Sequence, residues 1–236
     1  MTLGNGYMCV RSCEDEYIPE QSDRLMLIAG MYNLHEQETT WIQNAPDFTN
    51  TVFSADGEEV RPMPASAGEH TDKYEQFCKC FDMRDGLLQR SFVYHTESGK
   101  TLSFHFERIV SLERMHVMAV RCTVKTDRDV QLKIRSGIIN TEPDCFVEKT
   151  ARSAQSSVGY TCVTDESGIT FSLATDARCT LGTRELRRIG VSEEQDAIFE
   201  DFSFTLSPDE TLVFEKICAV HTSRDLENES LSTEQI

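Results

Sequence analysis

The chain has 236 residues, of which 39% are hydrophobic, and a formal net charge of −17 at pH 7. Binding to nucleic acid or to an anionic membrane needs clustered Lys and Arg, so this acidic composition argues against both partners. The sequence contains no run of 18 apolar residues and therefore predicts no transmembrane helix. A chain of this length can form one all-β domain with a substantial core.

The start of the chain and its cysteines indicate the compartment. The first 15 residues contain no basic segment followed by an apolar one, which predicts no signal peptide. Cysteine occurs nine times, an odd number, without the spacing of a small disulfide framework. We therefore expect a cytoplasmic protein with mostly reduced thiols.

The first predicted element is a turn in LGNGYMCVRSCEDEY, residues 3–17. A phosphate-binding loop would need Lys and then Ser or Thr after its glycines, at the start of a helix. Here the sequence Tyr-Met-Cys follows, in a strand-like context. Gly4, Asn5 and Gly6 instead predict a tight turn, because Gly and Asn readily accept positive φ angles.

Two acidic clusters, Glu14–Glu16 and Glu58–Glu59, are the first candidates for acid–base chemistry. Two catalytic carboxylates must face each other across a cleft, which neighbouring residues on one loop cannot do. We therefore predict that both clusters are solvated charge runs.

Two cysteine pairs could suggest a metal site. Cys9 and Cys13 are four residues apart, and Cys78 and Cys80 are two apart, with no His nearby. A structural zinc site uses four ligands, usually from paired knuckles, and neither spacing fits. The sequence predicts buried, inert thiols here and no metal site.

Trp41 is the only tryptophan and lies in the irregular stretch TTWIQNAPDF. A single aromatic residue in a loop can stack on a sugar, but more often it closes a core edge or an interface. If the chain binds carbohydrate, Trp41, Tyr32 and Phe48 are the candidate stacking residues.

Alternation of apolar and polar residues dominates the middle of the chain and predicts strands with one buried face. In residues 101–110, Leu102, Phe104 and Phe106 share the predicted inner face, and His105 and Glu107 share the opposite one. The same alternation recurs in the following segments: 87–95, 117–124, 130–139, 199–206 and 211–220.

Short connections join several of these segments. TESGK, residues 96–100, predicts a hairpin in which His95 and His105 face each other. SPDE, residues 207–210, predicts a turn between the last two strands. Residues 183–198 could hold one or two helical turns.

Strands at short spacing with few short helices predict a large antiparallel β-sandwich. We assign residues 1–222 to this domain. Residues 223–236 are polar and lose the alternation, so we expect a linker there. No nucleophile-elbow motif is present, and no nucleophile, base and orienting group are brought together by the pattern. The residues alone therefore predict a scaffold with no catalytic residue and no cofactor.

Several segments resemble, in order, the N-terminal domain of glycoside hydrolase family 65, which contains maltose, trehalose and kojibiose phosphorylases. LGNGYMCVRSCEDEY resembles the opening motif of that family, a G-N-G-Y turn followed by Val-Arg-Gly and an acidic patch. Residues 29–48, AGMYNLHEQETTWIQNAPDF, resemble its Gly-x-Tyr strand and Asn-Ala-Pro-Asp stretch. Residues 81–94, FDMRDGLLQRSFVY, resemble its Leu-Asp-Met-Arg-x-Gly hairpin, and FERIVSLERMHVMAVRCTV, SGIINTEPD and KICAVHTSRD follow in the expected order.

This resemblance implies a β-sandwich of the galactose-mutarotase type, a supersandwich, placed before an (α/α)6 barrel. In such enzymes the barrel carries the general-acid glutamate and the site of the phosphate that attacks the anomeric carbon with inversion. The barrel is absent from this chain and would be its main partner, with a homodimer as a further expectation. An α-glucosidic sugar and phosphate would be bound through the parent enzyme.

The opening motif supplies the candidate contacts to that barrel: Gly4, Asn5, Gly6, Tyr7 and Arg11. Cys9 and Ser12 stand where the family has glycine, and both restrict φ, so the local backbone is expected to differ. Residues 14–16 are expected to lie against the barrel as well.

Two other functions stay open. One is an autonomous carbohydrate-binding module that uses the three aromatic residues named above. The other is a stand-alone mutarotase-like epimerase, which would need a His and a Glu that converge on a concave sheet face. His105 and Glu107 share one predicted strand face. No second element can be assigned to meet them, and we expect no activity from the chain itself.

Overall fold

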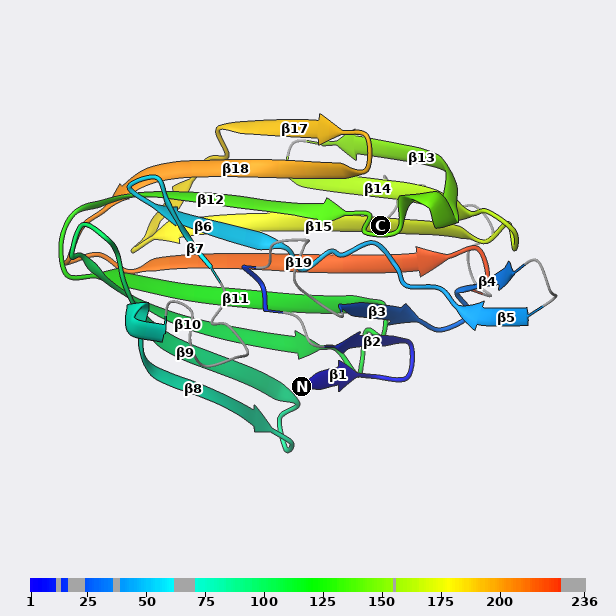
Figure 1. Ribbon diagram of the computed structural model, residues 1–236, viewed down its shortest axis with the longest axis horizontal. Helices are drawn as coiled ribbons and strands as arrows, with labels where there is room; N and C mark the ends of the chain where they lie inside the picture. Colours follow the sequence, from blue (N-terminus) through cyan, green and yellow to red (C-terminus); the bar gives the residue numbers. More distant parts are fainter. Residues whose placement is uncertain (12–13, 17–23, 36–38, 62–70, 155, 226–236) are drawn as a thin grey trace.

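The computed structural model describes residues 1–11, 14–16, 24–35, 39–61, 71–154 and 156–225 (Figure 1). Their regular secondary structure is antiparallel strands, with short 3-10 turns at η2 (Thr71–Lys73) and η3 (Pro143–Cys145). No helix in these ranges is long and apolar enough to cross a membrane.

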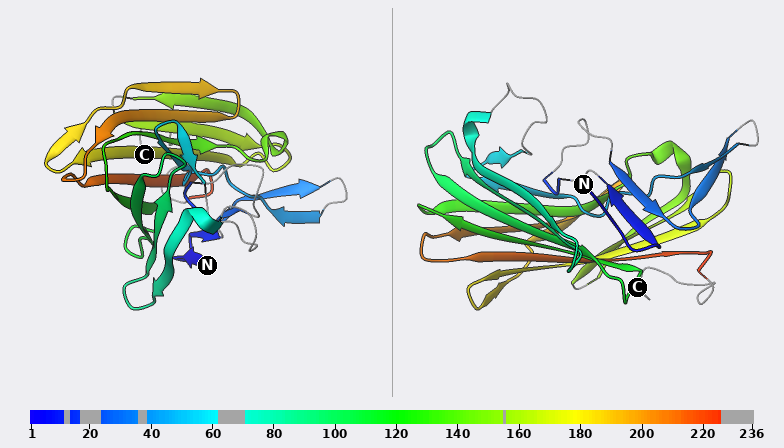
Figure 2. Two further views of the ribbon diagram at one scale, coloured as in Figure 1. Left: turned by 60° about the vertical axis from the view of Figure 1, so that its left-hand side comes forward. Right: turned by 90° about the horizontal axis from the view of Figure 1, so that it is seen from below.

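The largest sheet has nine strands in the order β13-β14-β15-β19-β11-β10-β9-β8, with β16 paired to β15. It is long and strongly twisted (Figure 2). The strands are β8 (Tyr74–Asp82), β9 (Leu87–His95), β10 (Thr101–Val110), β11 (Val117–Thr126), β13 (Phe146–Ser153), β14 (Ser157–Thr164), β15 (Thr170–Leu181), β16 (Arg184–Leu186) and β19 (Leu212–Thr222).

A second sheet, of five strands in the order β17-β18-β12-β6-β7, covers the inner face of the first (Figure 1). Its strands are β6 (Thr51–Ala55), β7 (Glu58–Val60), β12 (Val130–Ile139), β17 (Gly190–Glu194) and β18 (Ala197–Leu206). Two stacked antiparallel sheets confirm the predicted sandwich.

The N-terminal segments add two small sheets. One has the order β1-β2-β3, from β1 (Thr2–Gly4), β2 (Met8–Arg11) and β3 (Leu25–Ile28). The other is the hairpin of β4 (Tyr32–His35) and β5 (Thr39–Ile42), which projects from the body of the sandwich in both views (Figures 1 and 2).

The core lies between the two large sheets, where the predicted alternation is confirmed. Leu102, Phe104 and Phe106 are 0–3% exposed. Phe104 is opposite Phe92 on β9, and the two rings stack with centroids 5.1 Å apart. Phe53 of the second sheet meets Phe104 edge to face at 5.4 Å, so aromatic packing joins the two layers.

The β9–β10 hairpin forms as predicted, but its register differs from the expectation for the histidines. His95 is opposite Thr101, and His105 is opposite Ser91. The two histidines therefore do not face each other. The prediction was wrong because the five-residue connection pairs its flanking residues His95 and Thr101, which leaves His105 four residues further along β10.

Residues 183–198 are not helical. Arg184–Leu186 form β16, which folds back on β15 through Gly182 at a φ of 59°, and Gly190–Glu194 form β17, which pairs with β18. Pairing with a neighbouring strand outweighs the local helical pattern. The turn at residues 207–210 leads from β18 in one sheet to β19 in the other.

Both edge strands of the large sheet carry a bulge. The register of β8 shifts between Glu75 and Cys78, where Gln76 has a φ of 53°, and β13 shifts between Val147 and Thr150, where Glu148 has a φ of 50°. An extra residue twists an edge strand and hinders its pairing with another chain. The sandwich is therefore protected at both ends of this sheet.

Candidate functional site

The opening turn is anchored by one side chain. Asn5 Oδ1 accepts hydrogen bonds from the backbone N–H groups of Tyr7 and Met8, at 3.0 and 2.9 Å. Asn5 Nδ2 donates to the carbonyls of Ser111 and Met115, at 2.7 and 2.8 Å. The predicted turn is present, and it binds the first strands to the loop between β10 and β11. Arg11 lies exposed at the end of β2.

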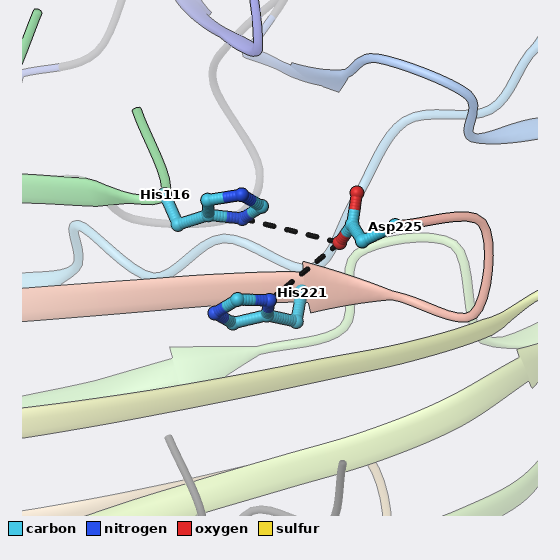
Figure 3. A group of neighbouring side chains, drawn as sticks. All are labelled: His116, His221 and Asp225. Carbon is cyan, nitrogen blue, oxygen red and sulfur yellow. Dashed lines mark ion pairs between the residues drawn. The ribbon is translucent and has the colours of Figure 1, made fainter. Parts of the chain in front are cut away.

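Tyr7 leads from this turn into a cluster with His116, His221 and Asp225, and Figure 3 shows the last three. The rings of His116 and His221 stack with centroids 4.1 Å apart and an angle of 8° between their planes. The Tyr7 ring lies 4.0 Å from that of His116. Asp225 Oδ2 accepts hydrogen bonds from the Tyr7 hydroxyl at 2.8 Å and from the Thr222 N–H at 2.7 Å.

The same Asp225 oxygen faces both imidazoles, at 3.9 Å from His116 Nδ1 and 3.6 Å from His221 Nδ1 (Figure 3). His116 Nδ1 lies 2.9 Å from the carbonyl oxygen of Val220, which can only accept, so this nitrogen carries a proton. Burial lowers the pKa of His221, the neighbouring His116 lowers it further, and Asp225 partly opposes both. Burial raises the pKa of Tyr7 above its ordinary value, and the hydrogen bond to Asp225 adds to this.

Sequence reasoning missed this cluster because its members come from three segments that are far apart in the sequence. His116 precedes β11, and Tyr7 lies more than two hundred residues before Asp225. The only available signal was the resemblance itself, since Tyr7 belongs to the opening motif and Asp225 ends the closing motif KICAVHTSRD.

A hollow of about 400 Å³ lies beside the cluster, over the small N-terminal sheet. Arg224 borders it: its guanidinium lies 5.4 Å from the Tyr32 ring centroid and donates to the Tyr32 hydroxyl at 3.2 Å. Gly30 has a φ of 79°, and a Cβ there would lie 3.5 Å from Arg224 Cδ. The hollow is lined mainly by apolar or small residues, among them Gly4, Gly6, Tyr7, Leu27, Ile28, Met31 and Ile42.

The three predicted stacking residues do not form one surface. Phe48 is fully buried and presents no ring face to a ligand. Trp41 is opposite Asn33 in the β4–β5 hairpin, whereas Tyr32 is opposite Ile42, so Trp41 and Tyr32 point to different faces. Trp41 is not in a loop but on a strand, 38% exposed, and its Nε1 donates to Gln43 Oε1 at 3.1 Å.

The prediction of a solvated charge run at residues 14–16 is wrong. Asp15 and Glu16 are 3% and 0% exposed. The two terminal nitrogens of Arg90 donate to the two carboxylate oxygens of Glu16, and Arg108 pairs with Asp15. Glu14 is 2.8 Å from Arg90 Nε.

The arginines gave the missing signal. Arg90 and Arg108 occupy inward positions of β9 and β10 in the same alternation as the core phenylalanines. Two cations on a predicted buried face require carboxylates from elsewhere in the chain. These residues are therefore part of the sandwich interior and leave no exposed acidic patch among residues 14–16 except the partly exposed Glu14.

The other acidic pair is partly engaged. Glu58 accepts hydrogen bonds from Lys73 Nζ and from the Tyr94 hydroxyl, both at 2.8 Å. Burial raises the pKa of Glu58, but its hydrogen bonds outweigh this and hold the pKa below the ordinary value. This carboxylate joins β7 to the large sheet, and its partner Lys73 also pairs with Glu97 at 3.1 Å.

The prediction of buried thiols at the two cysteine pairs is wrong for their described members, since Cys9 is only half-buried. Other cysteines of the chain are in the core. Cys122, Cys162, Cys179 and Cys218 are fully buried. Burial raises the pKa of Cys162 and Cys179 to about 12, which makes these thiols unreactive. In contrast, Cys78 and Cys80 are exposed on edge strand β8, because the sheet ends there. Cys13 lies outside the described residues.

His105 and Glu107 do not assemble the acid–base site of an epimerase. Glu107 lines a hollow of about 740 Å³ on the outer face of the large sheet, and Arg121 is 3.7 Å from its carboxylate. Arg121 also binds Glu215 at 2.7 Å. His105 is not among the residues that line this hollow.

The chain is similar to known proteins over nearly its whole length. Residues 1–235 match the family described as Glycosyl hydrolase family 65, N-terminal domain. A kojibiose phosphorylase of Caldanaerobacter subterraneus subsp. tengcongensis is 25% identical over 98% of this chain and 31% of that protein. An uncharacterized glycosyl hydrolase of Mycobacterium tuberculosis is 25% identical over 94% of this chain and 18% of that protein.

A solved structure of a candidate kojibiose phosphorylase from the human microbiome has the same fold. Its TM-score is 0.83 at 16% identity, over 99% of this chain and 31% of that one. The chain thus spans less than a third of the length of each of these relatives.

Proposed function

Because the chain belongs to the family of glycosyl hydrolase family 65 N-terminal domains, we propose that it is the non-catalytic β-sandwich of a longer disaccharide phosphorylase or related glycosidase. The observation that carries this proposal is the match of residues 1–235 to that domain, while only 31% of the kojibiose phosphorylase is covered. The parent would act on an α-glucosidic disaccharide with phosphate in an (α/α)6 barrel outside this chain.

The proposed task of the sandwich is to hold that barrel in place and to shape the edge of its sugar cleft. We assign the hollow over the N-terminal sheet as the surface that contacts this barrel. Arg224, next to the last described residue, packs on Gly30 and Tyr32 at the border of this hollow. Ile42 there is 67% exposed, and burying such a side chain favours association by about 2 kcal/mol.

A cytoplasmic location belongs to the same proposal. All described cysteines are free, including the exposed Cys78 and Cys80 on β8. Exposed thiols two residues apart persist most readily in a reducing compartment.

Phosphorolysis by the isolated chain tests the proposal. We expect no release of glucose 1-phosphate when the 236-residue chain is incubated with phosphate and kojibiose, nigerose, trehalose or maltose. A full-length family 65 phosphorylase serves as the positive control. Turnover by the chain alone would show that catalytic groups lie in the sandwich and would refute the proposal.

A carbohydrate-binding module remains the second candidate, favoured by the partial exposure of Trp41 on the projecting hairpin. Calorimetry with the same sugars separates the two functions. Heat that disappears in Trp41→Ala but persists in Ile42→Ala would establish the module, because Ile42 lies on the opposite face of the same strand. No heat is expected from the wild-type chain if the domain only supports a barrel.

A further inference from the structure

The cluster at the end of β19 contains the ligand types of a transition-metal site. His116, His221 and Asp225 each offer one ligand atom, and these three atoms lie within 4.8 Å of one another. Each side chain is partly buried, with 32%, 20% and 16% of its surface exposed. An ion could therefore enter from solvent and still be shielded from most of it.

Two features prepare these groups for an ion. His221 Nδ1 is buried and has no hydrogen-bond partner in the described part of the chain, although it faces Asp225. In addition, His116 Nδ1 and His221 Nδ1 both face the same oxygen of Asp225, at 3.9 and 3.6 Å.

The carboxylate is already oriented by its surroundings. Asp225 Oδ2 is held by the Tyr7 hydroxyl and the Thr222 N–H, as outer-shell donors hold the carboxylate ligands of metal sites.

We propose that His116, His221 and Asp225 bind a divalent transition-metal ion of the zinc type. Two imidazole nitrogens and one carboxylate oxygen suit such an ion and leave one tetrahedral position for water.

The stacked rings show what binding must change. Lone pairs of parallel imidazoles do not converge on one point, so the His116 ring must turn and give up the hydrogen bond from Nδ1 to the Val220 carbonyl. The ion replaces the proton on that nitrogen, and the proton is released to solvent. The bound ion would join the loop before β11, the end of β19 and the last described residue.

Cobalt(II) titration of the 236-residue chain tests this proposal. The exposed thiols are removed first, in a Cys78→Ser/Cys80→Ser background, because they are the strongest competing ligands. We expect a ligand-field absorption band without thiolate charge transfer, which zinc(II) abolishes by competition. His116→Gln and His221→Gln should each weaken binding at least tenfold, and the outer-shell variant Tyr7→Phe about tenfold.

His105→Gln is the matched control, because His105 lies on the outer sheet face away from the cluster. It should bind cobalt as well as the Cys78→Ser/Cys80→Ser chain does. Circular dichroism and urea unfolding without metal show that each variant is folded. If either His variant does not fold, two other measurements replace it. Asp225→Asn should weaken cobalt binding, and zinc should raise the melting temperature of the unsubstituted cluster. Failure to bind at millimolar cobalt, thiolate charge transfer, or binding unchanged in both His variants would each overturn the proposal.

Discussion

Arg90 and Arg108 place positive charge inside the sandwich, where each has a carboxylate partner. The inner faces of β9 and β10 are otherwise apolar, and the carboxylates come from residues 14–16. Burial lowers the pKa of Arg90, but Glu16, Glu14 and Asp15 outweigh this and raise it above its ordinary value. The pairing holds the N-terminal segment to the large sheet.

Arg90→Met should lower the free energy of unfolding by about 3–5 kcal/mol, because it leaves Glu16 charged and buried without its partner. The control Arg121→Met removes an exposed ion pair with Glu215 and should cost no more than about 1 kcal/mol. Urea unfolding of both variants measures the difference. Equal, small losses would mean that the interior pair contributes little.

Gly137 of β12 allows a close approach of β18. A Cβ at this position would lie 2.3 Å from Phe199 Cδ1 and 2.5 Å from the Ile198 carbonyl oxygen. Gly137→Ala should therefore destabilise the chain by about 1–3 kcal/mol through forced displacement of these groups. Gly190→Ala, where no atom lies within 4 Å, should change stability by no more than about 0.5 kcal/mol in the same unfolding experiment. If both variants unfold alike, the contact is looser than the geometry shows.

Glu200 makes the interior sensitive to pH. Its carboxylate oxygens have no hydrogen-bond partner among the described residues, and Arg188 Nη1 lies 3.6 Å away. Burial raises the pKa of Glu200 from 4.5 to about 7, opposed by Lys216 and Arg188. Burial in turn lowers the pKa of Lys216.

Because the folded state binds the Glu200 proton more tightly, its contribution to stability is complete below pH 4.5 and is lost as the pH rises to about 7. Glu200→Gln mimics the protonated form. The variant should gain stability relative to wild type between pH 4.5 and 7, by up to about 3 kcal/mol. Urea unfolding across this range checks the slope, and a difference that does not change with pH would refute the assignment.

At the level of elements, the Asn5 turn connects parts of the sandwich that are distant in sequence. Asn5→Ala removes four hydrogen bonds and should cost about 2–3 kcal/mol. Gly6→Ala tests the backbone conformation alone. No atom lies within 4 Å of a new Cβ there, so the expected cost of about 1 kcal/mol comes only from the φ of 93°. Thermal and urea unfolding give both values. Asn5→Ala with no greater effect than Gly6→Ala would show that the anchoring contacts are weak.

The strands could be predicted because their alternation reflects which face is buried. The segments 101–110 and 117–124 needed no further information. Residues 183–198 could not be predicted, since β16 and β17 are extended only through pairing with β15 and β18. Local pattern decides an element only where tertiary pairing agrees with it.

The candidate site was less predictable than the fold. The turn at Asn5 follows from local chemistry, but its partners Ser111 and Met115 lie more than a hundred residues away. The prediction that Trp41 and Tyr32 stack together on a sugar was wrong, because they lie on opposite faces of the β4–β5 hairpin. The face of each residue depends on the pairing register of the hairpin, which the sequence does not give.

At the scale of the whole molecule, a sandwich that supports a second domain needs a surface for that domain to cover. The surface that we propose for this role is the hollow over the N-terminal sheet, with Ile42 exposed at 67% and Arg224 at its border. The bulged edges of the large sheet make pairing through strand edges unfavourable. Association of the isolated chain, including any dimer, should therefore use this apolar surface.

Sedimentation velocity of the 236-residue chain with a hydrophobic fluorescent dye tests this requirement most directly. We predict dye binding and concentration-dependent self-association, both reduced in Ile42→Ser and unchanged in Ile217→Ser, which lies on the outer sheet face at 53% exposure. A chain that stays monomeric at all concentrations and binds no dye would contradict the proposed role. It would show that the isolated sandwich exposes no apolar surface for a second domain to cover.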